Sequence, residues 1–589
     1  MNQPVISRQA FVRSAGAVAA VAGAGMLGAT VARAEEAATE EPAADAPADA
    51  APASGITAAD YEGKWAFEIA PEPITDIAET VEAELVVVGA GYAGMATATS
   101  AQQSGVQTVL VSASSMVTCR GGSNNATYSR VMEAAGIGRD DFDIENVYQE
   151  EIVSACGNRV DSTKWSRYAN SSEEAMNWLL DLTEARGVGC CLEICNSDPD
   201  DPRSPTHMFP ASHCFITEDM TFAGIGQGLA MDALEDEFLQ QGGTIYYNNV
   251  AKQLTRDGVP NGTTGRVDGV IAQNDQGAYV LYKASKAVVL ATGDFSRDRD
   301  MLAKYCPQAI DFVNWEKAAY WDEEEGYDYG LHPDESAGLF HGDGHKMGLW
   351  VGAAWQKTVP CATNVQGSWV CATQPYGSHR GLIVNKNGIR YNNEDCNGGA
   401  CAMAQQMQPD HASACIWGLN YAEDAAPWHT FGQHNGDPGV DPAEIVAGWD
   451  DNVEAGTYFK CDTIEELAEA LGLPVEQTVA TVERYNELCD GGRDLDFFKK
   501  AKYMVRIDPP FYGAWNTLPQ FFTVHGGLRT NTNMQVCDAN DEPIPGLYNV
   551  GTMIGDFFSN IYTFRIQGQS YGSCLTFGYL TGKYIAENE

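Results

Sequence analysis

Three glycines near the start of the chain have the spacing of a phosphate-binding turn. Gly89, Gly91 and Gly94 form a G-x-G-x-x-G motif directly after the apolar run 84–88. Glycines at this spacing allow a tight turn and let the backbone approach a pyrophosphate, whose charge then faces the N-terminus of the following helix. The motif therefore predicts a dinucleotide-binding site.

The elements that would position this turn are all present. Residues 84–88 are expected to form a strand, the alanine-rich stretch after the glycines a helix, and residues 108–112 a second strand. Such units usually place an acidic residue at the end of the second strand, where it holds the ribose. That position is Ser112 here, so other contacts must hold the adenosine ribose.

The composition is that of a large, acidic, globular protein. The chain has 589 residues, of which 44% are hydrophobic, so it can bury a sizeable core, and its length favours two or more domains. Its formal net charge is −44. So acidic a chain argues against nucleic acid or an anionic membrane as the main partner, because both are negatively charged.

The first 34 residues have the pattern of an export signal. Arg8 and Arg13 accompany an apolar, alanine- and glycine-rich run, and a small-residue cleavage site ends at Ala34. The segment SRQAF resembles a twin-arginine signal in which Gln9 replaces the second arginine. We expect export to the periplasm, the cell surface or the medium, with residues 35–60 as a disordered, acidic Ala/Pro linker.

Sixteen cysteines in an exported chain could form disulfides, but the sequence does not fix their pairing. The chain contains no C-x-x-C-H motif. We therefore expect no haem of the c type on this chain.

Five stretches downstream of the glycine turn resemble one family in the same order. They resemble the flavoprotein subunits of fumarate reductase and succinate dehydrogenase, together with the urocanate reductases and 3-ketosteroid dehydrogenases related to them. The stretches are TCRGGSNNATYS (118–129), KAVVLATGDFS (286–296), HGDGHKMGLWVGA (341–353), RGLIVNKNGIRYNNE (380–394) and the segment 544–586. The resemblance implies FAD, bound without a covalent link.

The resemblance also implies which residues contact FAD. They are the residues at the matching positions of these motifs and of the glycine turn: Gly89, Gly91, Tyr92, Ala93, Gly94, Ser112, Arg120, Gly121, Gly122, Ser123, Ala291, Thr292, Gly293, Asp343, Gly551, Gln569 and Ser570. The segment NGTTGRV (261–267) superficially resembles a covalent FMN acceptor. It lacks the final threonine and stands between two strand-like runs, so we interpret it as a hairpin turn.

Arg565 stands alone among glycines, glutamines and aromatics in residues 562–578. Counted back from Gly578, it matches the arginine of the family's N-R-x-G-G-N loop, which in fumarate reductases holds a substrate carboxylate above the flavin. A planar guanidinium can donate two parallel, charge-assisted hydrogen bonds to a carboxylate. The alternative is a structural arginine, paired with Asp556 or stacked on a neighbouring phenylalanine.

Four other substrate-binding residues of fumarate reductases have no counterpart. Their positions fall on Thr523, near Thr358, on Gly398, and in the window 414–424, which contains no arginine. These losses argue against fumarate, a small dianion that needs several cations around it. They favour a larger alkene with one carboxylate or none, and the aromatic residues near the C-terminal loop favour a flat, apolar one.

Reduction of a C=C bond by hydride also needs a proton donor. The first candidate is Tyr421, which lies in the window without the arginine, and the alternatives are Tyr562, Tyr571 and His525. Each tyrosine could instead be core or pocket lining. We expect His525 to contact the flavin or the pocket, and we predict no metal site, because no second histidine or cysteine stands at metal-ligand spacing.

The resemblance implies an α/β architecture with a Rossmann-like, split FAD-binding domain and an inserted α+β capping domain. We expect residues 80–300 and 500–589 to form the FAD-binding domain around a parallel sheet. Residues 300–500 should supply a mobile cap, interleaved with elements of the FAD-binding domain. Within it, Asp462 followed by Glu465 predicts the start of a helix.

Three functions are compatible with these residues. The first is an exported FAD-dependent reductase of an α,β-unsaturated carboxylate, aromatic or bulky, that serves anaerobic respiration. Since the chain has no haem or iron–sulfur signature, its electrons would come from a separate donor such as a membrane-linked cytochrome. The second is an FAD-dependent dehydrogenase or reductase of a ketosteroid or another enone. The third is a flavin electron carrier without turnover.

Overall fold

The computed structural model describes most of the chain after the predicted signal and linker. The described residues are 63–119, 123–139, 144–192, 211–216, 227–312, 321–322, 326–327, 340–365, 381–396, 398–425, 441–516, 520–563 and 566–589. The predicted signal and linker, Arg120, Gly121, Gly122 and Arg565 lie outside them.

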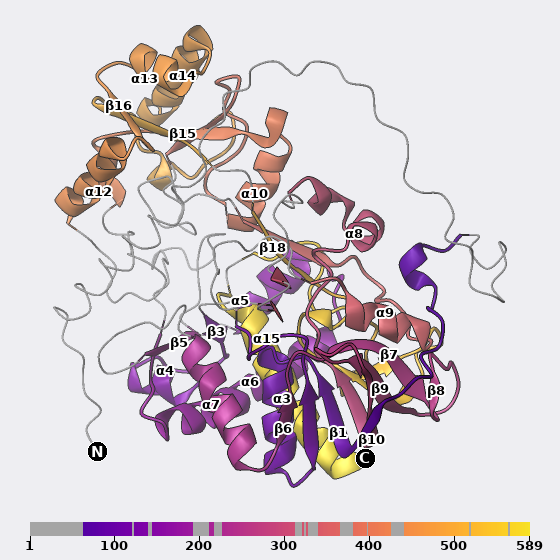
Figure 1. Ribbon diagram of the computed structural model, residues 1–589. Helices are drawn as coiled ribbons and strands as arrows, with labels where there is room; N and C mark the ends of the chain where they lie inside the picture. Colours follow the sequence, from indigo (N-terminus) through magenta and orange to yellow (C-terminus); the bar gives the residue numbers. More distant parts are fainter. Residues whose placement is uncertain are drawn as a thin grey trace.

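Two apolar strands form the centre of the larger lobe (Figure 1). β1 (Glu79–Val88) and β10 (Tyr279–Leu290) each end in a fully buried run and pair in parallel, as strands covered on both faces do. They belong to a nine-stranded mixed sheet of order β6-β2-β1-β10-β9-β7-β8, in which β20 also pairs with β10, and β19 with β20. The other strands are β2 (Thr108–Val111), β6 (Thr244–Tyr246), β7 (Val250–Arg256), β8 (Val259–Pro260), β9 (Val267–Gln273), β19 (Gln535–Cys537) and β20 (Pro543–Asn549).

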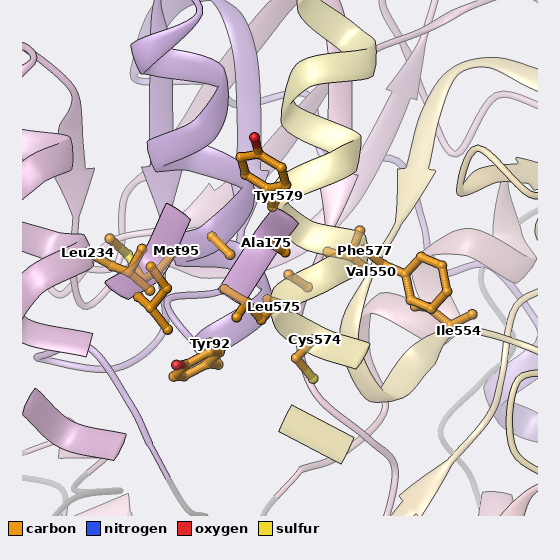
Figure 2. Packing of buried hydrophobic residues seen from close by; sticks show 14 of the residues in the cluster. Tyr92, Met95, Ala175, Leu234, Val550, Ile554, Cys574, Leu575, Phe577 and Tyr579 are labelled. Carbon is orange, nitrogen blue, oxygen red and sulfur yellow. The ribbon is translucent and has the colours of Figure 1, made fainter. Parts of the chain in front are cut away.

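Alternate residues of β1 enter two different cores. Leu85 and Val87 belong to the core formed with helices α3, α6, α7 and α15, whereas Val86 and Val88 belong to the core that includes α9. Figure 2 shows side chains of α3, α6, α7 and α15 converging in the first core. The helices are α3 (Tyr92–Gln103), α6 (Ser162–Glu184), α7 (Gln227–Gln240), α9 (Asp343–Trp350) and α15 (Gln569–Asn588).

The large lobe also contains two small sheets besides the central one. One has the order β3-β5-β4, and the other is a two-stranded ribbon, β13-β18. Their strands are β3 (Asn124–Asn125), β4 (Gly189–Leu192), β5 (Ser212–Ile216), β13 (Cys361–Val365) and β18 (Gln520–His525). The remaining short elements are α4 (Arg130–Ala134), α5 (Ile144–Tyr148), α8 (Arg299–Tyr305), β11 (Trp321–Asp322) and β12 (Gly326–Tyr327).

A second lobe, formed by the described residues of 381–516, has its own sheet of order β14-β15-β17-β16. It lies at the top of Figure 1, away from the central sheet. Leu382 and Ile383, neighbours on β14, enter different cores, so this sheet is also covered on both faces. The elements are β14 (Leu382–Asn385), β15 (Ser413–Gly418), β16 (Phe459–Cys461), β17 (Phe511–Trp515), α10 (Gly398–Gln406), α11 (Tyr421–Ala425), α12 (Pro442–Glu454), α13 (Ile464–Leu471) and α14 (Val475–Asp490).

Two local predictions for this lobe need correction. The boundary at residue 500 is too early, because β17 pairs with β15 and β16 and belongs to the second lobe. The cap of α13 is Thr463, with Glu466 completing the capping box, one residue after the predicted Asp462 and Glu465. Residues 261–266 lead from β8 to β9, which do not pair with each other because β7 lies between them; the antiparallel pair here is β7 and β9, so the stretch is part of their longer connection and not a tight hairpin turn of its own.

Within the described ranges, no helix combines the length and the apolar character needed to cross a membrane. No disulfide joins cysteines in the part of the chain that the structure describes.

Candidate active site

The turn at residues 89–94 leaves room for a ligand at one of its three glycines. A β-carbon at Gly94 would overlap the carbonyl oxygen of Gly89, and a β-carbon at Gly89, whose φ is +114°, would overlap that of Ala291. At Gly91, the nearest atom to such a carbon would be Thr118 Oγ1 at 3.8 Å. Two glycines therefore allow close packing, and Gly91, the N-cap of α3, leaves open space beside its backbone where a phosphate can bind.

The end of β2 carries hydroxyl groups and no carboxylate. Ser112 Oγ lies 2.7 Å from Ser114 Oγ, and Ser114 Oγ donates to the carbonyl oxygen of Met116 at 2.6 Å. Both serines are buried. The expected ribose carboxylate is thus replaced by a hydroxyl pair.

Further predicted contacts meet at the ends of the strands. Ala291 follows β10 and donates its N–H to the Val88 carbonyl oxygen at 2.8 Å. Thr292 Oγ1 accepts from the N–H of Gly344 at 3.0 Å, which ties this turn to the start of α9. The neighbouring glycine of this turn, Gly293, has a φ of +81°. Asp343, the first residue of α9, is exposed.

The start of α15 forms the other end of the predicted cofactor site. The side-chain atoms Gln569 Nε2 and Asn124 Oδ1 are buried and have no hydrogen-bond partner among the described residues. Both residues flank Gly568, whose α-carbon packs against the backbone of Ser123 and Asn124. Buried polar groups of native proteins are normally satisfied. The polar edge of a flavin ring offers donors and acceptors for such groups, so the residues present fit FAD.

Gly551 connects the two ends. It follows β20, has a φ of +84°, and a β-carbon there would lie 3.1 Å from Ala93 Cβ. Tyr92, the first residue of α3, packs edge-on against Tyr571 of α15 with ring centroids 4.8 Å apart. The predicted cofactor-binding residues at the starts of α3 and α15 and just after β20 therefore lie beside one another.

His525, at the end of β18, is a buried, uncharged side chain. Its Nδ1 lies 3.0 Å from Thr363 Oγ1, and its Nε2 lies 2.7 Å from Ser570 Oγ. Burial lowers the pKa of His525 to about 3, so the imidazole is neutral at physiological pH. The ring stacks on Tyr562 at 5.6 Å and contacts Phe558 at 4.5 Å between centroids.

The predicted proton donors lie in different places. Tyr562 is buried beside His525, its hydroxyl oxygen accepts from the Ser570 N–H at 3.3 Å, and burial raises its pKa well above the usual range. Tyr571 Oη lies 3.4 Å from Cys119 Sγ. Tyr421 lies in a core of the second lobe, where its hydroxyl oxygen accepts from the Gly381 N–H at 2.9 Å. The structure therefore groups Tyr562 with His525 and separates Tyr421 from them.

Two threonines at fumarate-reductase positions hydrogen-bond to buried aspartates. Thr523 Oγ1 donates to Asp294, and Thr358 Oγ1 donates to Asp556 Oδ1 at 2.9 Å. Asp556 also accepts from the backbone N–H groups of Lys357 and Thr358. Its carboxylate, considered above as an alternative partner for Arg565, is thus hydrogen-bonded within the large lobe.

Sequence reasoning missed three residues of this site. Asp294 fixes β18 by accepting from the Val524 N–H at 3.0 Å, Thr363 orients His525, and Asn124 presents its side chain beside Gly568. Asp294 and Asn124 stand inside quoted motifs, but only the folded chain brings Asp294 to Thr523 and Val524 by hydrogen bonds and Asn124 to His213 by strand pairing.

Comparison with known proteins gives a consistent result. The model of the FAD binding domain family matches residues 84–563. The vinyl phenol reductase of Lactiplantibacillus plantarum is 26% identical over 86% of this chain and 96% of its own length. The urocanate reductase of Eggerthella lenta is 25% identical over 90% of this chain and 78% of its own length. Among solved structures, a 3-ketosteroid-Δ4-(5α)-dehydrogenase from Rhodococcus jostii RHA1 shares the fold, with a TM-score of 0.61 at 22% identity, covering 87% of this chain and 98% of its own.

Proposed function

The chain belongs to the FAD binding domain family, and on that premise we propose that it reduces the C=C bond of an aromatic or bulky α,β-unsaturated carboxylate. It is an FAD-dependent oxidoreductase acting on C=C bonds, as its resemblance to fumarate reductases predicts. The proposal concerns the substrate and the residues that bind it. When FAD is bound, it supplies the hydride.

The observation that carries the proposal is the aromatic, uncharged wall around His525. His525, Phe558 and Tyr562 contact one another, and His525 bears no charge at physiological pH. Flat apolar surfaces bind flat apolar groups by burial and ring stacking. An aryl or heteroaryl group on the alkene matches such a wall, in keeping with the two reductases of aromatic alkenes among the relatives.

The carboxylate would be held by Arg565. This assignment comes from the position of Arg565 in the C-terminal loop motif. One guanidinium is sufficient for one carboxylate, because two parallel charge-assisted hydrogen bonds fix its charge and orientation. The threonines at two positions of the missing cation cage hydrogen-bond to Asp294 and Asp556, which supports a substrate less charged than fumarate.

For the proton, the structure favours Tyr562 over Tyr421. Tyr562 lies against His525 and at the start of α15, whereas the hydroxyl of Tyr421 lies beside the Gly381 N–H in the second lobe. The phenol of Tyr562 is protonated, as a proton donor must be, and the burial that raises its pKa also makes it a weaker acid than an exposed tyrosine. Tyr421 stays a prediction that depends on how the second lobe closes.

Three further parts of the proposal concern the whole protein. The second lobe would act as a cap that closes over the substrate and excludes water. Export rests on the pattern of the first 34 residues. Electrons would come from a separate donor, plausibly a membrane-linked cytochrome, and rapid reduction of the holoprotein by NADH would contradict this part. Non-covalent attachment of FAD predicts that acid precipitation releases the flavin.

The decisive experiment is anaerobic. The purified holoprotein is reduced with a low-potential dye and mixed with aryl acrylates, their esters, vinyl phenols and cyclic enones, and flavin reoxidation is followed by absorbance. Turnover of an aryl acrylate but not of its ester, abolished in Arg565→Met but retained for neutral alkenes, supports the proposal. Equal turnover by Arg565→Met would show that the arginine is structural.

A second candidate is the reduction of a neutral aryl alkene. It is favoured by the uncharged aromatic character of His525, Phe558 and Tyr562, which contact one another. Turnover of vinyl phenols but not of acrylates would select it. Turnover of cyclic enones alone would instead select the ketosteroid-type alternative.

A further inference from the structure

Two cysteines face each other across neighbouring strands of the small sheet β3-β5-β4. β4 and β5 are antiparallel, and Cys191 and Cys214 are direct partners in their register. Directly opposed residues of antiparallel strands project from the same face of the sheet. Cys190 precedes Cys191 on β4 and therefore projects from the opposite face.

The spacing that this register imposes is the spacing of a disulfide. Opposed residues of antiparallel strands have Cα atoms about 4.5 or 5.5 Å apart, depending on whether the pair exchanges hydrogen bonds. Disulfides span Cα separations of about 4.4–6.8 Å. Either kind of pair therefore permits a bond without moving the backbone. We propose that Cys191 and Cys214 form a cross-strand disulfide when the protein meets a disulfide oxidant, such as a thiol-oxidising protein of an export compartment.

The difference in exposure between Cys191 and Cys214 determines which of them reacts first with the oxidant. Cys191 is half-buried, whereas Cys214 is fully buried. The Cys191 thiolate attacks a sulfur of the oxidant, its proton goes to solvent, and one oxidant thiolate leaves. The Cys214 thiolate then attacks the Cys191 sulfur of the mixed disulfide, and the second oxidant thiolate leaves. The two cysteines lose two electrons and two protons, and the oxidant is reduced to two thiols.

The bond would act on the flavin end of the cofactor site through β5. His213 of β5 pairs with Asn124 of β3, and its ring Nδ1 lies 3.1 Å from the Asn124 carbonyl oxygen. The neighbouring Asn125 donates its N–H to the Gly568 carbonyl oxygen at 3.1 Å. A cross-link between β4 and β5 therefore restrains the strand on which Asn124 and the start of α15 rest. We expect slower FAD release, and a Tm raised by about 5 °C as the cross-link constrains the unfolded chain.

The test uses the holoprotein, oxidised glutathione as the oxidant, alkylation of remaining thiols, and peptide mapping by mass spectrometry without reduction. The expected result is a linked peptide pair containing Cys191 and Cys214. Cys190→Ser is the matched control on the same strand and should retain the link, as should Cys195→Ser, which tests the cysteine nearby in the sequence.

The variants distinguish the order of steps. Cys214→Ser should stop at a glutathione adduct on Cys191, whereas Cys191→Ser should leave Cys214 unmodified. Two alkylated thiols, or a persistent glutathione adduct at Cys191 in the wild type, would overturn the proposal. The wild-type measurement decides even where a variant fails to fold, and it does not depend on the substrate.

Discussion

The two ends of the predicted cofactor site are built in opposite ways. The nucleotide end consists mainly of one continuous stretch, β1, the glycine turn, α3 and β2, within residues 79–111. The predicted flavin end brings together Thr363 of β13, His525 of β18, Ser570 of α15 and Tyr562 of the loop before it, and these come from separate parts of the sequence. A sequence motif can specify the first end, but strand pairing and helix packing must assemble the second.

The largest expected effect tests the nucleotide end. In Gly94→Ala, the new β-carbon would overlap the carbonyl oxygen of Gly89. Because the oxygen is part of the backbone and the β-carbon is attached to the backbone, neither atom can move aside. We therefore expect loss of the soluble folded protein. Gly91→Ala is the matched control, because its nearest neighbour would be 3.8 Å away. It should fold but retain little flavin, which circular dichroism and the flavin absorbance of the purified protein can check. Equal flavin content in Gly91→Ala and the wild type would break the comparison.

The next effect concerns the flavin end. Tyr562→Phe removes the proposed proton donor and should lower kcat by about 10² or more, since positioned acids typically contribute that much. Tyr421→Phe removes only a hydroxyl beside the Gly381 N–H and should change kcat little. Single-turnover flavin reoxidation with the best substrate of the panel measures both. The reverse outcome would move the proton donor to the second lobe.

Acid should destabilise the large lobe, because tertiary packing buries three of its histidines. Burial lowers the pKa of His525 to about 3 and the pKa values of His213 and His345 to about 4, from an unfolded value of 6.5. The unfolded chain therefore binds more protons, and stability is lost as the pH falls below 6.5. At pH 5 each histidine should cost on the order of 2 kcal/mol.

Urea denaturation at pH 7 and pH 5 measures this loss. His525→Gln removes one titrating group and should make the loss smaller. An unfolding free energy that does not change between the two pH values would show that these histidines are already protonated in the folded protein.

The smallest effect tests a local prediction in the second lobe. Thr463→Ala removes the cap of α13, whose side chain accepts from the Glu466 N–H at 3.2 Å, and should cost about 1 kcal/mol. Asp462→Ala, one residue earlier, should cost much less. Thermal unfolding of the two variants compares them, and a larger cost for Asp462→Ala would favour the position expected from the sequence.

Much of the fold could be predicted because its signals are local. The apolar ends of β1 and β10 and the glycine spacing each depend on neighbouring residues. The boundary at residue 500 was wrong because β17 acquires its place by pairing with β15, far earlier in the chain. The helix start at Asp462 was displaced by one residue, because Asp462 and Thr463 are both good caps and only the backbone geometry selects Thr463.

The sequence by itself predicted the nucleotide turn, because glycine spacing and strand hydrophobicity act over short distances, and the resemblance of its ordered motifs to one family implied FAD. The tertiary structure decided which side chains face one another. It brought Asp294 and Thr523, and Ser570 and His525, into hydrogen-bonding contact, and it buried Tyr421 in a core of the second lobe. It also decided that His525 is neutral, because the desolvation that lowers its pKa comes from residues that only folding brings around the ring.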